Sequence, residues 1–377
     1  MTIPIFSRRL ETTARNMDVH EPLASATTWG SATETKSLVS VVLPPEVTRA
    51  AQERAAVLRD VPQRTGKKTF SELEPNENQK TWELESRRYL HECVDPSIAE
   101  LFSAFASCKN SLHLRGLPGE ELPPTAPYTG RSNFRQIPQT LMNVFGVISL
   151  MGGYAFAYSS ENHGNTIRDV VARSDAEFEL SSQGWRNALP WHMDGAFRPI
   201  LTTELNNVPD LAKAPRWLVF GVIYGSGEVP FIFIPVDALL QRLSKSEIQT
   251  LCQPEFDVHS SASFSPARIS SGLPILVPDG RGGYFSRFNQ VRCFGTTAAG
   301  RNALTSFSQV LHEPEIHYRI DLEPGDIVVL DNWTSLHMRL AYSPHWNGVD
   351  RWLVRVYAAQ SEQDGVPVCP TNPRVWK

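Results

Sequence analysis

The spacing of apolar residues along the chain changes near residue 111. Before that point, apolar side chains recur about every three to four residues, the period of an amphipathic helix. The pattern predicts a helix over 44–58 and a mainly helical stretch over 76–109 with a break at Pro96. Residues 36–110 are therefore expected to form a helical scaffold packed on the rest of the chain. Residues 1–35, rich in Thr, Ser and Ala and without periodicity, are expected to be a loosely ordered arm.

Beyond residue 111 the apolar runs are short and separated by turn residues, which predicts β-strands. Helices are expected between them, one of which carries Ser244 followed by Glu247 in the spacing of a capping box. Many short strands with irregular inserted helices favour an α+β, mainly β fold, a double-stranded β-helix (jelly-roll) barrel over 111–377. The expected strands are 111–115, 153–158, 217–224, 231–236, 275–278, 316–322, 327–330 and 352–358, and the expected helices are 132–149, 236–251 and 297–312.

Composition narrows the function classes. The chain is 41% hydrophobic and 20% charged, ordinary for a globular protein, and its net charge of −4 gives no reason to expect a nucleic acid or membrane partner. The five Cys form no CxxC pair, which indicates reduced thiols and neither a disulfide framework nor a zinc site. No apolar run approaches the roughly eighteen residues of a transmembrane helix, and the N-terminus lacks the apolar core of a secretory signal. We expect a cytoplasmic protein acting on a small molecule.

Candidate chemistry begins in the segment 189–197. If that segment is an extended strand, His192 and Asp194 lie two positions apart and project from one face. A second histidine, His337, follows an apolar strand and a polar turn. Two His and one carboxylate make a facial triad with three open positions, which suits non-haem Fe(II). In a chain with 10 His, the alternative is that the His-x-Asp triplet arises by chance.

The last predicted strand carries two arginines. Strand alternation places Arg351, Leu353, Arg355 and Tyr357 on one face, with the two guanidinium groups leaving the strand about 13 Å apart. A guanidinium binds a carboxylate with two parallel hydrogen bonds, so each arginine is a candidate anion-binding group. The alternative for Arg355 is a solvated position at the barrel rim.

Taken together, these segments resemble the clavaminate synthase-like (TauD/TfdA-type) branch of Fe(II)/2-oxoglutarate-dependent oxygenases, which includes hydroxylases of free amino acids. The resemblance implies that His192, Asp194 and His337 bind Fe(II), and that O₂ and 2-oxoglutarate are co-substrates. It also implies that Arg351 binds the distal carboxylate of 2-oxoglutarate and Arg355 the α-carboxylate of the substrate. The resemblance covers about 95–360 and rests on 112–118, 161–170, 180–184, the His-x-Asp triplet, 325–332 with His337, and the Arg351 strand.

The chain departs from this family at two places. Several close relatives carry Glu where this chain has Asp194, which shortens the ligand and keeps its charge. Relatives often place a Thr or Ser near the distal carboxylate of 2-oxoglutarate, whereas the matching segment here, 227–231, has neither. Arg351 should then carry more of the binding, or a hydroxyl from elsewhere should replace the missing one.

Weaker candidates flank the triplet. The resemblance places Gln183, Glu179 and Glu177 where relatives hold the substrate amino group, although acidic residues before a strand are usually solvated. Trp191 and Phe288 are candidate substrate contacts, and core packing explains them equally well. A further expectation is that Asp331 and Asn332 orient the turn that carries His337.

The implied reaction oxidises an unactivated C–H bond of a free amino acid or close derivative, by hydroxylation, desaturation or cyclisation in the biosynthesis of a specialised metabolite. The segment 285–294 contains no Asp or Glu, so a buried cationic substrate side chain would lack a partner there. This favours a neutral, apolar side chain. The alternatives are an oxygenase of another small carboxylate or sulfonate, a different metal enzyme on the same barrel, and a barrel that only binds a ligand.

Overall fold

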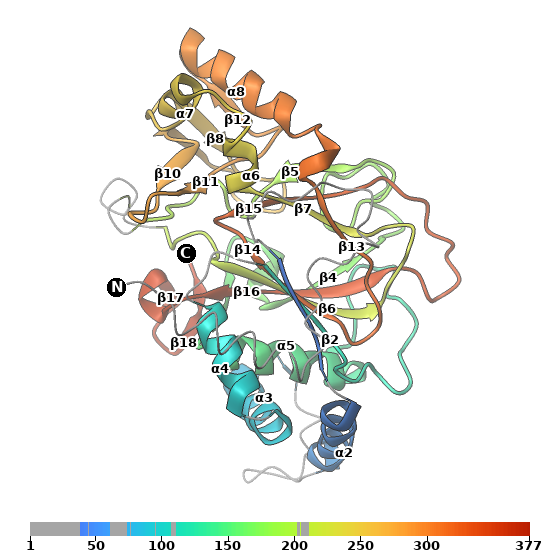
Figure 1. The fold of residues 1–377 in the computed structure, drawn as a ribbon. Helices are drawn as coiled ribbons and strands as arrows, with labels where there is room; N and C mark the ends of the chain where they lie inside the picture. Colours follow the sequence, from blue (N-terminus) through green and yellow to red (C-terminus); the bar gives the residue numbers. More distant parts are fainter. Residues whose placement is uncertain are drawn as a thin grey trace.

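Strands dominate the part of the chain that the computed structural model describes, which is residues 38–43, 45–60, 74–75, 77–94, 96–106, 111–201, 204 and 211–377. Helices lie on one face of the largest sheet and at the opposite end of the molecule (Figure 1). The expected mainly β fold with N-terminal and inserted helices is confirmed. The predicted arm over 1–35 lies outside the described residues, and the division into 36–110 and 111–377 stays a prediction.

The helices follow the predicted pattern closely. The break expected at Pro96 separates two helices, and the region 236–251 forms two helices instead of one. The second of these begins at the predicted capping box, in which Ser244 and Glu247 each bond the other's backbone N–H. The helices are α2 (Pro45–Asp60), α3 (Gln79–Cys93), α4 (Pro96–Phe105), α5 (Pro138–Leu150), α6 (Val236–Leu240), α7 (Lys245–Leu251) and α8 (Ala298–Val310). None of the described helices is long and apolar enough to cross a membrane.

The largest sheet, here called the major sheet, has nine strands in the order β1-β2-β14-β6-β16-β3-β18-β17, with β4 also paired to β16. Most of its central pairs are antiparallel, whereas β1 pairs with β2 and β18 with β3 in parallel. Its strands are β1 (Leu38–Val42), β2 (Ser111–Arg115), β3 (Tyr154–Tyr158), β4 (Ile167–Val171), β6 (Trp217–Tyr224), β14 (Ile327–Asp331), β16 (Trp352–Ala359), β17 (Pro367–Cys369) and β18 (Asn372–Trp376).

A four-stranded sheet, here called the minor sheet, has the order β13-β7-β15-β5. Two smaller sheets, β10-β11 and β12-β8-β9, lie beside α6, α7 and α8 (Figure 1). The strand expected over 316–322 is shorter than predicted because a 3₁₀ turn occupies Pro314–Ile316. The remaining strands are β5 (Leu189–His192), β7 (Phe231–Pro235), β8 (Phe256–His259), β9 (Ile269–Leu273), β10 (Leu276–Pro278), β11 (Tyr284–Ser286), β12 (Cys293–Gly295), β13 (Tyr318–Ile320) and β15 (Ser335–Arg339).

Strand β16 separates two apolar cores, as its alternation predicts. Leu353 and Tyr357 belong to the core that the major sheet shares with the minor sheet, together with Phe233 and Phe307. The residues between them belong to a second core, which holds Trp352, Val354, Val356 and side chains of α2, α3 and α5. The side of β16 that carries Arg355 therefore faces the space between the two sheets.

Candidate functional site

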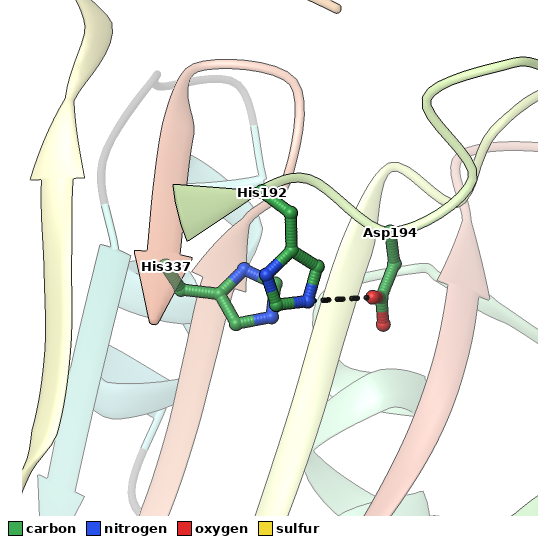
Figure 2. Close-up of side chains that lie close together, drawn as sticks. All are labelled: His192, Asp194 and His337. Carbon is green, nitrogen blue, oxygen red and sulfur yellow. Dashed lines mark ion pairs between the residues drawn. The ribbon is translucent and has the colours of Figure 1, made fainter. Parts of the chain in front are cut away.

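Two histidines face each other across adjacent strands of the minor sheet. His192 ends β5 and is the direct antiparallel partner of His337 in β15. Their ring centroids lie 4.2 Å apart, and both side chains are buried. Figure 2 shows the two imidazoles turned toward the same point as the carboxylate of Asp194. The second histidine sits inside a strand and not at the end of a turn, which corrects the expected local structure around it.

Asp194 lies in a turn, and the expectation that it shares a strand with His192 is wrong. Strand β5 ends at His192, and Gly195 has a φ of +72°, in the region that favours glycine. The side chain of Asn332 holds this turn: its Oδ1 accepts from Asp194 N at 2.9 Å and its Nδ2 donates to Asp194 O at 3.0 Å. Asp194 Oδ1 still reaches to 3.4 Å from His192 Nε2.

The three side chains form a donor set for a divalent cation. One ligand atom from each lies within 4.8 Å of the others. His192 Nδ1 donates to the carbonyl of Pro190 at 2.7 Å, which leaves Nε2 unprotonated and turned toward the carboxylate. Burial and the neighbouring His192 lower the pKa of His337 to about 3, so its imidazole is neutral and can ligate. Two imidazoles and one carboxylate on one side fit the facial triad of non-haem Fe(II).

Arg355 is buried and bridges two carboxylates. Its Nη1 donates to Asp194 Oδ2 at 2.8 Å and its Nη2 donates to Glu161 Oε1 at 3.1 Å. Only 7% of the residue is exposed, so it is not a solvated rim residue. Burial alone would raise the pKa of Asp194, but the charge of Arg355 holds it well below its usual range. The carboxylate is therefore ionised and oriented before any ion binds.

Glu161 is a site residue that the sequence reasoning missed. It follows β3 closely, only 4% of it is exposed, and it lines the same pocket as the three candidate ligands. A buried carboxylate with a cationic partner is a functional-site signal once the fold is known. The sequence held only a weak sign of it, its place at the start of the segment 161–170.

Arg351 immediately precedes β16 and is also buried. Its Nε donates to the carbonyl of Val229 at 3.2 Å, and no described carboxylate pairs with it. Burial lowers its pKa, because the charged form loses its hydration. A buried guanidinium without an anionic partner is suited to an anionic ligand. Val229 lies in the segment 227–231, which has no Thr or Ser, so a backbone carbonyl and not a hydroxyl orients Arg351 there.

One pocket joins these groups. It lies between the minor sheet, which supplies the histidines, and the major sheet, which supplies Arg351 and Arg355. Its apolar wall includes Phe220, Phe231 and Met338, and its outer part has four serines. The charged and hydroxyl-bearing side chains on the pocket are Glu161, Arg168, Ser181, Ser182, Asp194, Ser261, Ser263, Arg292, Arg339, Arg351, Arg355 and Tyr357.

The predicted amino-group contacts lie elsewhere. Gln183 is buried and donates from Nε2 to the carbonyl of Gly130 at 2.7 Å. Glu179 pairs with Arg173 at 2.6 Å. Glu177 lies 3.8 Å from an arginine that is half exposed. All three serve the conformation of the segment before β5, and none lines the pocket.

The predicted aromatic contacts also point away from the pocket. Trp191 precedes His192 in β5, and neighbouring strand residues point to opposite faces, so Trp191 packs on His317 with centroids 4.9 Å apart. Phe288 packs on Phe307 of α8 at 4.8 Å. Of the segment 285–294, only Asn289, Val291 and Arg292 line the pocket. The expected apolar lining of the substrate site by Trp191 and Phe288 is therefore corrected.

The turn between β14 and β15 is held by Asp331, as expected. Its Oδ1 accepts from the backbone N–H of Trp333 at 3.1 Å and of Thr334 at 3.3 Å, and its Oδ2 pairs with Arg216 at 2.5 Å. This turn leads directly into the strand that carries His337. Asn332, as described above, acts on Asp194 instead, so one short turn supports ligands from two segments.

Comparison with known proteins gives a family match to one segment of the chain. The sequence profile of "Taurine catabolism dioxygenase TauD, TfdA family" matches residues 249–357, a segment that contains His337, Arg351 and Arg355. The match covers the C-terminal part of the candidate site, and over this segment the chain is similar to the TauD/TfdA family.

The chain is similar to several curated proteins, two of which are named after an amino acid. It is 24% identical to L-lysine 3-hydroxylase of Catenulispora acidiphila over 259 residues, covering 65% of the chain and 66% of that protein. It is 26% identical to L-asparagine oxygenase of Streptomyces coelicolor over 65% of the chain and 69% of the relative. A short stretch of 59 residues is 41% identical to clavaminate synthase 2 of Streptomyces clavuligerus, covering 16% of the chain and 18% of the relative.

Solved structures share the fold of this chain. Asparagine oxygenase in complex with Fe(II), 2S,3S-3-hydroxyasparagine and succinate superposes with a TM-score of 0.75 at 22% identity, over 89% of this chain and 98% of the other. The non-heme iron oxygenase OrfP in complex with Fe and alpha-ketoglutaric acid gives a TM-score of 0.71 at 18% identity, over 90% and 100%. At these identities the likeness shows the fold alone.

Proposed function

We propose that the chain is an Fe(II)- and 2-oxoglutarate-dependent oxygenase that oxidises an unactivated C–H bond of an amino acid or close derivative. The observation that carries the proposal is the His192, Asp194 and His337 cluster in one pocket with Arg351, a buried guanidinium without a described anionic partner. The names of the relatives, which include an L-lysine 3-hydroxylase, an L-asparagine oxygenase and an L-ornithine/L-arginine 3-hydroxylase, support an amino acid substrate.

We infer that the major and minor sheets are the two halves of a jelly roll. The four-stranded order β13-β7-β15-β5 opposite the central strands of the major sheet supports this, because the apolar core between them has one continuous layer of side chains. The likeness to solved oxygenase structures supports it as well. The site then lies inside the roll, between its sheets.

The residues of the site would bind the metal, the distal carboxylate of 2-oxoglutarate and the α-carboxylate of the substrate. His192, Asp194 and His337 would hold the iron and leave three positions open. Bound iron with 2-oxoglutarate and O₂ supplies the oxidation, in which one oxygen atom enters succinate with loss of CO₂ and the other enters the substrate C–H bond. Arg351 binds the distal carboxylate of 2-oxoglutarate, while Arg355 and Glu161 position the α-carboxylate and α-ammonium of the substrate. The buried pocket excludes water from these charged groups.

The test is anaerobic addition of Fe(II) and then 2-oxoglutarate to the metal-free protein, monitored for the weak visible charge-transfer band of the chelate. We expect a band in the wild type and none in His337→Ala or Asp194→Ala, whose circular dichroism should remain native. Because a facial triad reduced to two ligands binds poorly, each variant should also lose most of its Fe(II) affinity. A wild-type protein that binds Fe(II) but never shows the band would reject the proposal and favour another metal chemistry.

A further inference from the structure

Three alternating charges line one wall of the pocket. Arg355, Glu161 and Arg168 follow one another, with 3.1 Å between Arg355 Nη2 and Glu161 Oε1 and 3.7 Å between Arg168 Nη1 and the same oxygen. We propose that this cation–anion–cation series selects an acidic α-amino acid. The α-carboxylate of such a substrate would pair with Arg355, its α-ammonium with Glu161 and its side-chain carboxylate with Arg168. The inference rests on the proposed oxygenase function and names the substrate class of the same site.

The sheet register fixes the two arginines side by side. Arg168 in β4 is the direct antiparallel partner of Arg355 in β16. Side chains opposite each other in such a pair project from the same face with Cβ atoms about 5 Å apart, and like charges there are destabilising. Glu161 lies between the two guanidinium groups and offsets part of this repulsion. The second carboxylate on Arg355 is Asp194, which is one of the proposed metal ligands. With a metal ion on Asp194, Glu161 is the carboxylate left to balance both guanidinium groups, and this favours a further anion.

Arg168 has hydrogen-bonding capacity left for a ligand. Its Nε donates to Ser182 Oγ at 2.7 Å, and its side chain is 12% exposed, on the pocket side. The same pocket is also lined by Ser181, Ser261 and Ser263. A guanidinium and hydroxyl groups in one pocket are suitable partners for a carboxylate. Arg355 also has a buried Nε with no hydrogen-bond partner in the described part of the chain.

The charge balance of the pocket opposes a cationic side chain. Among the described residues that line it, five are arginines and two are carboxylates, Glu161 and Asp194. Both carboxylates already accept from Arg355. A lysine or arginine side chain would therefore be buried near guanidinium groups without an anion of its own, which is strongly unfavourable. An apolar side chain, the type expected from the segment 285–294, would leave Arg168 desolvated and without the anion that its position favours. The inference therefore replaces that expectation.

The competing explanation is that Arg168 only neutralises Glu161. That explanation leaves substrate preference unaffected by Arg168, so a substrate panel separates the two. The anaerobic protein with Fe(II) and 2-oxoglutarate is titrated with L-aspartate, L-glutamate, their amides L-asparagine and L-glutamine, L-leucine and L-lysine. The perturbation of the visible band reports binding, and succinate release under air reports coupling. We expect aspartate or glutamate to act at about ten- to hundred-fold lower concentration than its own amide.

Variants at one position test the residue assignment. Arg168→Gln should remove the preference for the acid over its amide, and Arg168→Lys should retain part of it, because the charge remains. Arg186→Gln is the matched control, since Arg186 is a largely exposed arginine outside the pocket, and it should leave the panel unchanged. If Arg168→Gln does not fold, the wild-type comparison of each acid with its amide still decides.

The outcomes separate this inference from the function on which it rests. Absence of the Fe(II)–2-oxoglutarate band would reject the oxygenase function and this inference with it. A normal band perturbed by asparagine, leucine or lysine, and by neither acidic amino acid, would overturn the inference and leave the function standing. Unchanged preference for the acid in Arg168→Gln would overturn the assignment to Arg168.

Discussion

Replacing Arg355 with Met should destabilise the metal-free protein much more than replacing Arg351 with Met. Arg355 is the cation between two buried carboxylates, at 2.8 Å from Asp194 and 3.1 Å from Glu161. Removing one member of a buried charge pair costs about 3–5 kcal/mol, because the remaining charge stays buried without its partner. Within the described residues, the Arg351 side chain donates a hydrogen bond to the carbonyl of Val229. Its loss leaves that acceptor unpaired, which costs about 1–3 kcal/mol of stability at most, and it also removes a desolvated charge.

Equilibrium urea unfolding of the metal-free wild type, Arg355→Met and Arg351→Met measures the difference. The same experiment with Mn(II), a redox-stable substitute for Fe(II), tests its cause. In Arg355→Met, a divalent cation bound at Asp194 takes over the compensation of this carboxylate. Metal binding stabilises the wild type as well, by mass action, but we expect Mn(II) to raise the free energy of unfolding of the variant by more. Equal losses in the two variants, or no extra recovery with Mn(II), would refute the assignment of Arg355 as the compensating cation.

Three further outcomes are expected. Arg351→Ala should raise the 2-oxoglutarate concentration needed for half-maximal succinate release by tens- to thousands-fold, equivalent to about 2–5 kcal/mol, whereas Arg355→Ala should mainly raise the substrate concentration needed. If both variants change the requirement for the same reactant equally, the two assignments are wrong. Asn332→Ala should weaken Fe(II) binding by about 10–100-fold although all three ligands remain, because Asn332 holds the backbone of Asp194. An Fe(II) titration that gives the wild-type affinity would argue against that role. Alkylation followed by peptide mapping should label the exposed Cys369 well before Cys293, because burial raises the pKa of the Cys293 thiol to about 12, and the reverse order would count against that burial.

The sequence was most informative where one local rule determined the structure. Alternation along β16 placed Arg351 and Arg355 toward the pocket, and the capping box at Ser244 located the start of α7. It failed at Asp194, where the two-residue spacing suggested a strand but a turn at Gly195 brings the carboxylate to the histidines. Because neighbouring strand residues point to opposite faces, a pocket position for His192 excludes Trp191 from the pocket. This could have been predicted from the sequence.

The remaining site residues depend on contacts between segments far apart in the chain. Glu161 is a site residue because β3 and β4 bring it beside Arg355, and no pattern around position 161 indicates that partner. Asn332 forms its hydrogen bonds with Asp194 across a separation of 138 residues in the sequence. Phe288 is beside α8 because of packing in the core. Such relations follow from the tertiary fold, so periodicity and spacing could not supply them.

The two sheets carry different halves of the proposed site, and this has a consequence for how activity could change. The histidines are attached to the minor sheet and the carboxylate-binding arginines to the major sheet, so the apolar layer between them sets the separation of metal and anion sites. Protein interiors are packed as densely as crystals, and a change of one methylene group is felt by its neighbours. Substitutions at Phe233 or Leu353, which bear no polar group, could therefore shift the point of attack along a substrate carbon chain. New regiochemistry could thus arise through packing alone, with every charged residue of the pocket retained.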